Sequence, residues 1–254
     1  MFIKRPPYSD VLASYGLAAS ASLPRRITVT VWNCHKCRHQ DWENDFAHVN
    51  RDSDILLLQE VRLTPALERL FTLPGFGWHM AQSFFSFRHG YACGVATGTP
   101  ACSREVFFLA EEREPFVRTH KMILGTVYNL NGTPLLALNV HGINFTPSAA
   151  FKRQMSGAGR ALAAFPGPVI FAGDFNAWSK TRRKILFAMA AEAGMTELHF
   201  HPDTRSRHLR HPVDHIFTRG LKTVSAQVLD NINSSDHRPL RACLELPPQV
   251  TETQ

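Results

Sequence analysis

The sequence lacks any long apolar run. Its longer apolar stretches, such as Ile55–Leu58 and Val169–Ala172, have the length of buried strands, whereas a membrane-spanning helix needs about 20 apolar residues. No repeat period and no low-complexity segment is visible, which argues against a solenoid or a disordered chain. With 44% hydrophobic and 19% charged residues, the 254-residue chain has the composition of a globular α/β protein with a sizeable core.

Several common signatures of catalytic and nucleotide-binding sites are also missing. The sequence has no GxxxxGK[ST] phosphate loop, no GxSxG nucleophile elbow, no HExxH pair and no GxGxxG fingerprint. These absences argue against P-loop NTPases, α/β-hydrolases, zincin metalloproteases and dinucleotide-binding enzymes.

Cysteine is scarce and irregularly spaced. Five cysteines, an odd number, do not form a disulfide framework and favour a reducing, cytoplasmic location. Cys34-x-x-Cys37 with His39 nearby raises the alternative of a zinc site, but no second ligand pair has matching spacing. Incidental cysteines at a strand end are the preferred interpretation.

The chain is expected to hold one domain, residues 27–247, preceded by an irregular arm (1–26) and followed by a tail (248–254). The segment Val11–Ala21 after Lys4 and Arg5 resembles a secretory signal in outline. Its polar residues and the early prolines Pro6 and Pro7 favour the arm instead. We find no linker that would divide the remainder.

Positive charge exceeds negative charge. The net charge is +7 without histidine and the isoelectric point is about 9.4. Such a balance favours polyanionic partners, nucleic acid or anionic lipid headgroups, and it implies no stable protein partner.

Strand-like and helix-like segments alternate along the chain. Period-two or continuous apolar patterns predict strands at Ile27–Asn33, Asp54–Glu60, Met122–Leu130, Pro134–His141, Gly167–Phe175, Val213–Arg219, Val224–Leu229 and Arg238–Leu246. Amphipathic patterns predict helices at Asp41–Asn50, Pro65–Leu73, Pro147–Phe165 and Thr181–Ala193. Asn131-Gly132 predicts a hairpin between two of the strands. A hairpin beside strand–helix–strand units indicates an α/β fold with mixed sheets.

Polar residues lie where the predicted strands end or begin. Four apolar runs end at such residues and two begin with them: Asn33, Glu60, His141, Asp174 with Asn176, Asp214, and Asp236 with His237. Antiparallel neighbours start where their partners finish, so these side chains are expected to gather at one rim of the sheets. Carboxylate and amide oxygens suit Mg²⁺ better than zinc, with Mn²⁺ as a substitute. A histidine beside carboxylates can act as a base or hold developing negative charge.

Six short motifs then support a family resemblance. They are VWN at Val31–Asn33, LLLQE at Leu56–Glu60, NVHGIN at Asn139–Asn144, GDFNAW at Gly173–Trp178, VDHIF at Val213–Phe217 and SDHRPL at Ser235–Leu240. In this order they resemble the DNase I-like endonuclease/exonuclease/phosphatase superfamily, over about Ile27 to Leu246. The stretch Glu112–Arg118 makes the chain most similar to the bacterial YafD-type proteins. The resemblance implies a four-layer α/β sandwich, two mixed β-sheets packed face to face with helices outside.

The resemblance also implies roles for the rim residues. Asn33 and Glu60 would hold Mg²⁺, with Asp236 close to it. Asp174 and Asn176 would orient the attacking water or touch the phosphate, and His141 would contact the phosphate or protonate the leaving oxygen. His237, fixed by Asp214, would be the base-like residue. The implied reaction is in-line attack of water on a phosphodiester.

Residues outside this set are candidates for substrate contact. The His/Arg-rich stretch His199–His215 contains Arg205, Arg207 and Arg210, which are expected to grip a phosphate backbone. A solvated loop is the alternative. Trp178 is a candidate for stacking on a base, and Asn144 for contacting substrate.

Nucleic acid is the leading substrate. A phospholipid or inositol-phosphate phosphoesterase would share the same catalytic residues and is the alternative that allows membrane contact; Phe84, Phe85 and Phe87 are its candidate contacts. A non-catalytic nucleic-acid-binding module is the second alternative.

Overall fold

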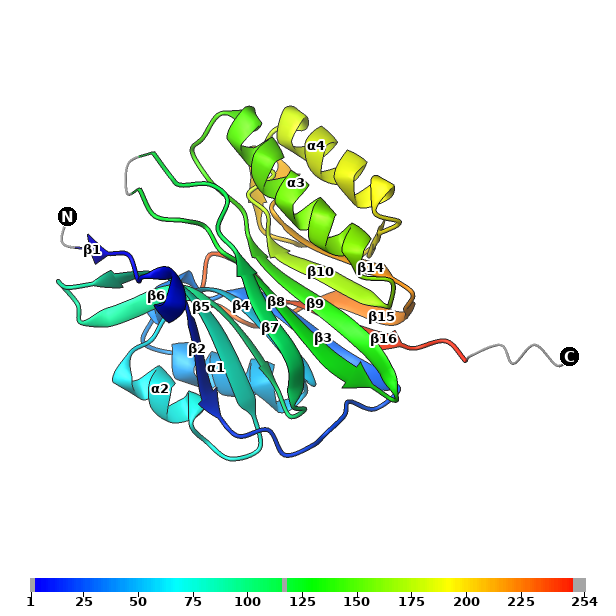
Figure 1. Cartoon of the computed structure of the whole chain (residues 1–254), viewed down its shortest axis with the longest axis horizontal. Coiled ribbons are helices and arrows are strands. Elements are labelled where there is room, and N and C mark those ends of the chain that lie inside the picture. The colour runs from blue at the N-terminus through cyan, green and yellow to red at the C-terminus, as the bar shows by residue number, and fades with distance from the viewer. Residues whose placement is uncertain (1–2, 116–117, 249–254) are drawn as a thin grey trace, which may run out of the picture.

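The structure, a computed structural model, describes residues 3–115 and 118–248 of the chain. Two mixed β-sheets lie face to face, and a pair of helices covers the outer face of each (Figure 1). Within the described residues no helix is both long enough and apolar enough to cross a bilayer.

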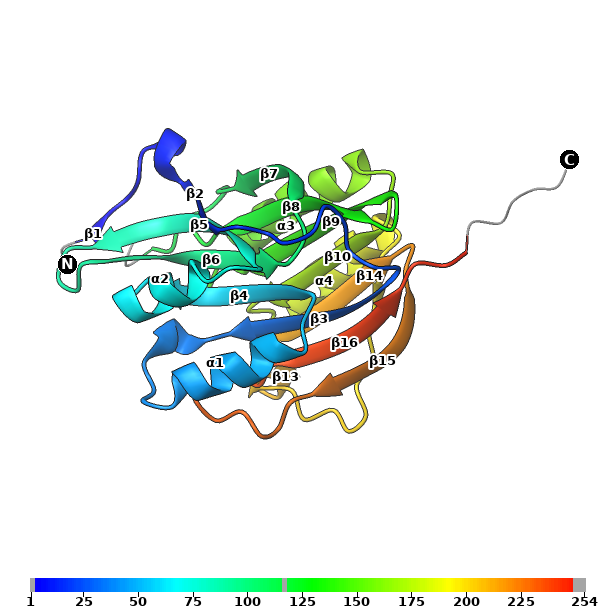
Figure 2. The ribbon, with the colours of Figure 1, turned by 90° about the horizontal axis from the view of Figure 1, so that it is seen from below.

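The first sheet has eight strands in the order β1-β5-β6-β4-β3-β16-β15, with β2 also paired to β5. They are β1 (Ile3–Lys4), β2 (Leu12–Gly16), β3 (Arg26–Asn33), β4 (Ile55–Arg62), β5 (Gly77–Ser86), β6 (Tyr91–Thr99), β15 (Lys222–Val228) and β16 (Leu240–Glu245). Helices α1 (Trp42–Arg51) and α2 (Pro65–Phe71) pack on the outer face of this sheet (Figure 2). Helix α2 begins where Pro65 meets the capping side chain of Thr64, which accepts a hydrogen bond from the Leu67 amide.

The second sheet has six strands in the order β11-β14-β10-β9-β8-β7. They are β7 (Ser103–Leu109), β8 (Ile123–Leu130), β9 (Thr133–His141), β10 (Val169–Asp174), β11 (Thr196–Glu197) and β14 (Asp214–Arg219). Helices α3 (Ser148–Ala164) and α4 (Lys180–Glu192) bury their apolar sides against it. Asn131 and Gly132 both have positive φ, 47° and 91°, so the predicted β8–β9 hairpin turn is confirmed.

A continuous apolar core fills the space between the sheets. Residues that point inward from the first sheet, such as Val29 and Leu57, pack against residues of the second, such as Ala137 and Ile170, and all four are at most 1% exposed. The prediction of a four-layer α/β sandwich is confirmed. Its consequence for the site is that the ends of β3, β4, β9 and β10 meet at one edge of the sandwich.

The structure departs from the sequence analysis in two respects. The arm over residues 1–26 is not irregular throughout, because Leu12–Gly16 forms the edge strand β2 on β5. Strands β5, β6 and β7 were not predicted. β6 is rich in small residues, and Gly98 there lies under the Trp78 ring, where a Cβ would come within 2.4 Å of it. The predicted tail 248–254 lies outside the described residues apart from its first residue.

Candidate active site

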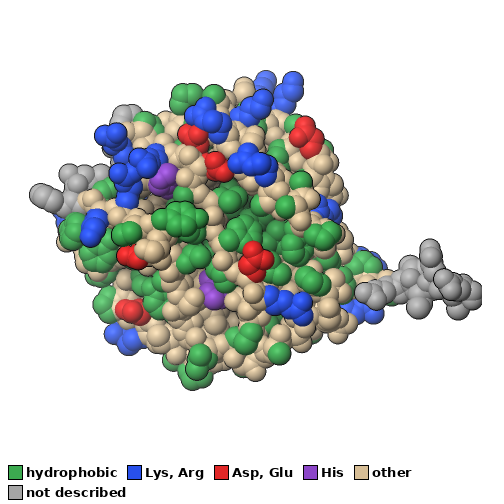
Figure 3. Space-filling model, in the orientation of Figure 1, with side chains coloured by type: hydrophobic (Ala, Val, Ile, Leu, Met, Phe, Trp, Pro, Cys, Tyr) green, Lys and Arg blue, Asp and Glu red, His purple; other side chains and the backbone are tan. Residues whose placement is uncertain are grey.

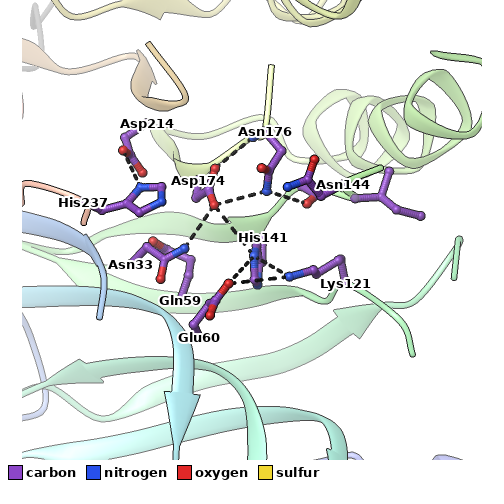
Figure 4. A network of polar contacts seen from close by, with 12 residues as sticks. Asn33, Gln59, Glu60, Lys121, His141, Asn144, Asp174, Asn176, Asp214 and His237 are labelled. Carbon is purple, nitrogen blue, oxygen red and sulfur yellow. Dashed lines mark hydrogen bonds and ion pairs between the residues drawn. The ribbon is translucent and has the colours of Figure 1, made fainter. Parts of the chain in front are cut away.

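Strand register brings the predicted rim residues together. On β10, Asp174 is the direct partner of His141 on β9 and of Asp214 on β14. In the first sheet, Asn33 at the end of β3 pairs with Gln59 on β4, next to Glu60. The two sheets join where the Asn33 side-chain amide donates a 3.1 Å hydrogen bond to Asp174 Oδ2 (Figure 4).

Asp174 is the centre of this cluster. Its side chain is buried, and it accepts hydrogen bonds from the Asn176 backbone amide at 2.9 Å and from the Asn176 and Asn33 side-chain amides, each at 3.1 Å. Burial raises the pKa of Asp174 to about 6; His237 opposes this rise, and the carboxylate of Asp214 adds to it. A carboxyl group with this pKa can exchange a proton near neutral pH.

Asp214 and His237 form an ion pair beside Asp174. His237 Nδ1 lies 2.8 Å from Asp214 Oδ2, and the Asp214 side chain is almost fully buried. Burial alone would lower the pKa of His237, but the Asp214 carboxylate outweighs it and raises the pKa to about 10. The imidazole is therefore held in its charged form at neutral pH. One of its ring nitrogens lies within 4.8 Å of a carboxylate oxygen of Asp174 and one of Asp214, and these two oxygens are equally close to each other.

Glu60 lies on the other side of Asp174, among positive groups. Lys36 Nζ is 3.0 Å from Oε2, and Lys121 Nζ and His141 Nε2 are 3.8 and 3.7 Å from Oε1. Burial in itself raises the pKa of Glu60, and these neighbours, His141 with Lys121 and Lys36, outweigh it and hold the pKa well below the usual range. Glu60 occupies a left-handed backbone conformation, φ 52°, where β4 departs from regular pairing with β6 between Leu58 and Val61.

His141 is buried and accepts rather than donates at Nε2. The Lys121 ammonium lies 2.8 Å from this nitrogen. Burial lowers the pKa of His141 well below its ordinary value, and the charge of Lys121 lowers it further. Of the two roles predicted for His141, protonation of a leaving oxygen is thus disfavoured by this arrangement, and Lys121 is the nearer source of positive charge.

The comparisons with known proteins agree with this geometry. Residues 30–237 match the Endonuclease/Exonuclease/phosphatase family. The chain belongs to this family. It is also 37% identical over 230 residues to a UPF0294 protein of Yersinia pseudotuberculosis, covering 89% of this chain and 86% of that protein.

Solved structures of similar fold extend the comparison. An endonuclease/exonuclease/phosphatase family protein from Leptotrichia buccalis has a TM-score of 0.67 at 16% identity, over 86% of this chain and 99% of that one. The 3′ phosphatase NExo from Neisseria, bound to a product DNA hairpin, has a TM-score of 0.55 at 20% identity, over 85% and 98%. At these identities the likeness is one of fold. The predicted likeness to YafD-type proteins stays a prediction.

Three residues of this endonuclease/exonuclease/phosphatase family site were not predicted. Lys36 and Lys121 surround Glu60, and the Gln59 side chain donates a 2.7 Å hydrogen bond to Asn139, which bridges the two sheets below the site. Lys121 precedes β8, which runs antiparallel to β9, so the strand-end argument applied to Asp214 would have found it. Lys36 lies in the short 3₁₀ turn η2 (His35–Cys37) with φ 62°, and no sequence pattern marks it.

Asp236 stands apart from its predicted companions. Its side chain is 65% exposed and lies 3.5 Å from His35 Nδ1. Among the described residues it makes no ion pair or hydrogen bond with Asn33 or Glu60. Its assignment as a metal ligand remains a prediction.

Asn144 and Trp178 line one flank of the site. The Trp178 indole nitrogen donates a 2.9 Å hydrogen bond to Asn144 Oδ1. The indole ring also meets His208 edge-on, with centroids 5.9 Å apart. His208 belongs to a small hairpin formed by β12 (Arg207–His208) and β13 (His211–Pro212), so the His/Arg-rich stretch does lie next to the rim.

The prediction that Arg205 grips phosphate is wrong. Its side chain is 8% exposed, and its three guanidinium nitrogens donate to Asp203 Oδ1, Glu197 Oε1 and Asp203 Oδ2, each at 2.9 Å. Because these nitrogens already donate to Asp203 and Glu197, Arg205 attaches the His/Arg-rich stretch to Glu197 on β11 and is not available to a phosphate. Arg207 and Arg210 are exposed, and their role in phosphate contact stays a prediction.

Replacing Arg205 with Gln should lower the free energy of unfolding by about 3–5 kcal/mol, because the buried guanidinium is lost: Asp203 keeps only the exposed Arg207 as an ion-pair partner, and Glu197 keeps only His215. The hydrogen bond from Arg205 lowers the pKa of Asp203 to about 2. A depressed pKa contributes stability above the unfolded value of about 3.9 that is lost as pH falls toward 2. The difference between wild type and variant in urea unfolding should therefore shrink at low pH. Arg210→Gln, on an exposed side chain of the same stretch that forms no ion pair among the described residues, is the matched control and should change stability by less than about 1 kcal/mol; equal losses in both variants would contradict the assignment.

Proposed function

We propose that this protein is a Mg²⁺-dependent phosphodiesterase that hydrolyses nucleic acid. The observation that carries the proposal is the buried Asp174, held by two amide side chains between the Asp214–His237 ion pair and the Glu60 cluster. Supporting it, the fold-related 3′ phosphatase from Neisseria has been solved with a DNA hairpin product, and the chain carries a net charge of +7.

The donor set around Glu60 fits a hard divalent cation. Glu60 Oε2 is buried and accepts no hydrogen bond of good geometry from the described residues, although Lys36 lies 3.0 Å away. This oxygen and the side-chain oxygen of Asn33, which lies opposite Gln59 on the next strand, are the ligands that Mg²⁺ prefers, and Mn²⁺ can replace it. When bound, the cation would neutralise charge on the phosphate oxygens.

The chain's own residues divide the remaining work. Asp174, with its pKa near 6, receives a proton from the attacking water, and the Asn176 and Asn33 amides fix its orientation. The charged His237, fixed by Asp214, stabilises the negative charge that develops on phosphorus-bound oxygens. Lys121 adds positive charge opposite it, next to His141.

The test of this function is nicking of supercoiled plasmid across a Mg²⁺ titration by the purified full chain, repeated with Mn²⁺. We expect cleavage that requires the metal and that EDTA abolishes. Folded wild-type protein that leaves plasmid and oligonucleotides intact, yet hydrolyses a phospholipid or inositol phosphate, would transfer the proposal to that alternative. Absence of hydrolysis of every diester tested would favour the binding-module alternative.

Replacing Glu60 with Gln should raise the Mg²⁺ concentration needed for half-maximal activity by at least about tenfold, the size of effect seen when metal sites lose a supporting group. The loss of charge weakens attraction for the cation, while the shape of the side chain is kept. Calorimetric titration with Mn²⁺ gives a readout that does not depend on turnover. Glu68→Gln, on the exposed side of α2, is the control; an unchanged metal requirement in Glu60→Gln would remove Glu60 from the ligand set.

A further inference from the structure

A groove leaves the candidate site toward the tip of the β5–β6 hairpin. A cavity of about 170 Å³ beside Glu60, Lys121 and His141 shares four lining residues, Ile3, Lys36, Phe84 and Cys93, with a second cavity of about 720 Å³. The shared wall makes the two cavities one continuous depression. None of the residues predicted to be catalytic lines the second, outer cavity.

The outer cavity, which we call the hairpin groove, is lined by positive side chains. Lys36, Arg38, Arg62 and Arg88 line it together with His89, and no Asp or Glu does so among the described residues. Within that part of the chain, Lys36 is paired with Glu60, whereas no ion pair is formed by Arg38, Arg62 or Arg88. Uncompensated like charges around a depression favour a polyanion as its occupant.

Aromatic rings stand beside these charges. Phe87, which lines the groove, is 59% exposed, and it contacts Phe85, 36% exposed, edge-on with centroids 5.5 Å apart. In Figure 3, Lys, Arg and hydrophobic side chains, with a few Asp or Glu, are mixed over the left part of the face drawn, where Figure 1 places β1 and the hairpin. An exposed ring next to arginines is the arrangement on which an unstacked base packs while cations track the backbone.

We propose that the hairpin groove binds single-stranded nucleic acid that continues from the scissile phosphate, with phosphates on Arg38, Arg62 and Arg88 and a base on Phe87. This inference rests on the proposed function of the site. A duplex keeps its bases stacked on one another and cannot offer a free base face to Phe87. A concave row of cations also follows a chain of phosphates better than a flat bilayer, which is the competing anionic surface.

The experiment measures fluorescence anisotropy of a labelled 15-nucleotide dT strand, and of a duplex of equal length, with the full chain in EDTA. The double variant Arg38→Ala/Arg88→Ala should bind the strand about tenfold or more weakly, and the slope of log affinity against log salt should fall by about 1 to 1.5. Lys184→Ala/Lys222→Ala removes the same charge from α4 and from the opposite edge strand β15, and it should leave both quantities unchanged. Phe87→Ala should weaken strand binding roughly 5- to 100-fold and duplex binding little, and Phe87→Trp should restore it.

Three results would overturn the inference. They are no binding of the strand by wild type, equal losses in the two double variants, and a Phe87→Ala protein that binds the strand as wild type does but loses binding when phosphatidylserine vesicles replace the strand as the ligand. Hydrolysis of bis(p-nitrophenyl) phosphate by wild type with Mg²⁺ is assayed separately. This small diester lacks the further nucleotides that the hairpin groove is proposed to bind, so its turnover tests the proposed function whether or not the groove binds a strand.

Discussion

Replacing Asp174 with Asn is expected to lower the turnover number of diester hydrolysis by about 10³-fold, in the middle of the range that a single general base contributes. The Asn side chain has nearly the same shape and keeps an oxygen that can accept from the Asn176 backbone amide, but it cannot receive a proton. The wild-type carboxyl has a pKa of about 6 because it is buried, so the rate of wild type should rise with pH through that region and the residual rate of the variant should not. Steady-state kinetics from about pH 5 to 8 with a small diester substrate give both quantities.

Asp54→Asn supplies the control for this change. Asp54 Oδ2 accepts a 2.7 Å hydrogen bond from the Thr28 amide at the opposite end of β3 and β4, away from the rim. The control should lose some stability and retain its turnover number. If Asp174→Asn kept more than a tenth of the wild-type rate at its own optimal pH, Asp174 would not be the proton acceptor.

The position of most site residues could be predicted because strand ends are determined locally. Asn33, His141 and Asp174 each follow a buried apolar run, and Asp214 opens one. Once the Asn131-Gly132 hairpin orients β8 and β9, the rule that parallel strands end at the same edge brings His141 and Asp174 together as register partners. The strand-end argument predicted only that residues of the two sheets share one rim; the direct contact of Asn33 with Asp174 depends on how one sheet packs on the other and was not predicted.

Electrostatic roles were less predictable because they depend on neighbours distant in sequence. In the sequence Arg205 is indistinguishable from its neighbours Arg207 and Arg210. In the structure its guanidinium is buried and forms ion pairs with Glu197 and Asp203. Likewise, the residues alone left open whether His237 acts as a base or stabilises negative charge, and the family resemblance implied that it is the base-like residue. The buried carboxylate of Asp214 at 2.8 Å, 23 positions away, favours the charged form in the structure.

The β4 irregularity at Glu60 shows why local patterns fail at functional positions. The apolar run predicts a strand that ends at Glu60, but β4 continues to Arg62 after a shift in register. A non-glycine residue with positive φ is costly, so the sheet does not benefit from this backbone. The effect of this backbone conformation is to place the Glu60 carboxylate at the rim, beside Lys36 and Lys121.

Removing both members of the Asp214–His237 pair is expected to cost little more activity than removing one. His237→Gln should lower the turnover number by about 10² to 10³-fold, because the positive charge that stabilises the developing phosphate charge is lost. Asp214→Asn should cost nearly as much, since without the carboxylate the pKa of His237 falls from about 10 toward its ordinary value and the ring loses its orientation. Each single substitution already removes the charged, oriented ring of His237. The second substitution therefore has little further to remove, and the effects of the two should be strongly non-additive.

The same three variants show whether Asp214 and His237 act as a pair or contribute to the turnover number independently. Independent roles would multiply, giving a double variant about 10⁴-fold or more below wild type. An Asp214→Asn protein is also expected to lose activity progressively as pH rises above about 7, since its histidine then deprotonates, whereas wild type should retain the charged ring until the pH approaches 10. Multiplicative losses, or identical pH profiles above neutrality for wild type and Asp214→Asn, would show that Asp214 does not act through His237.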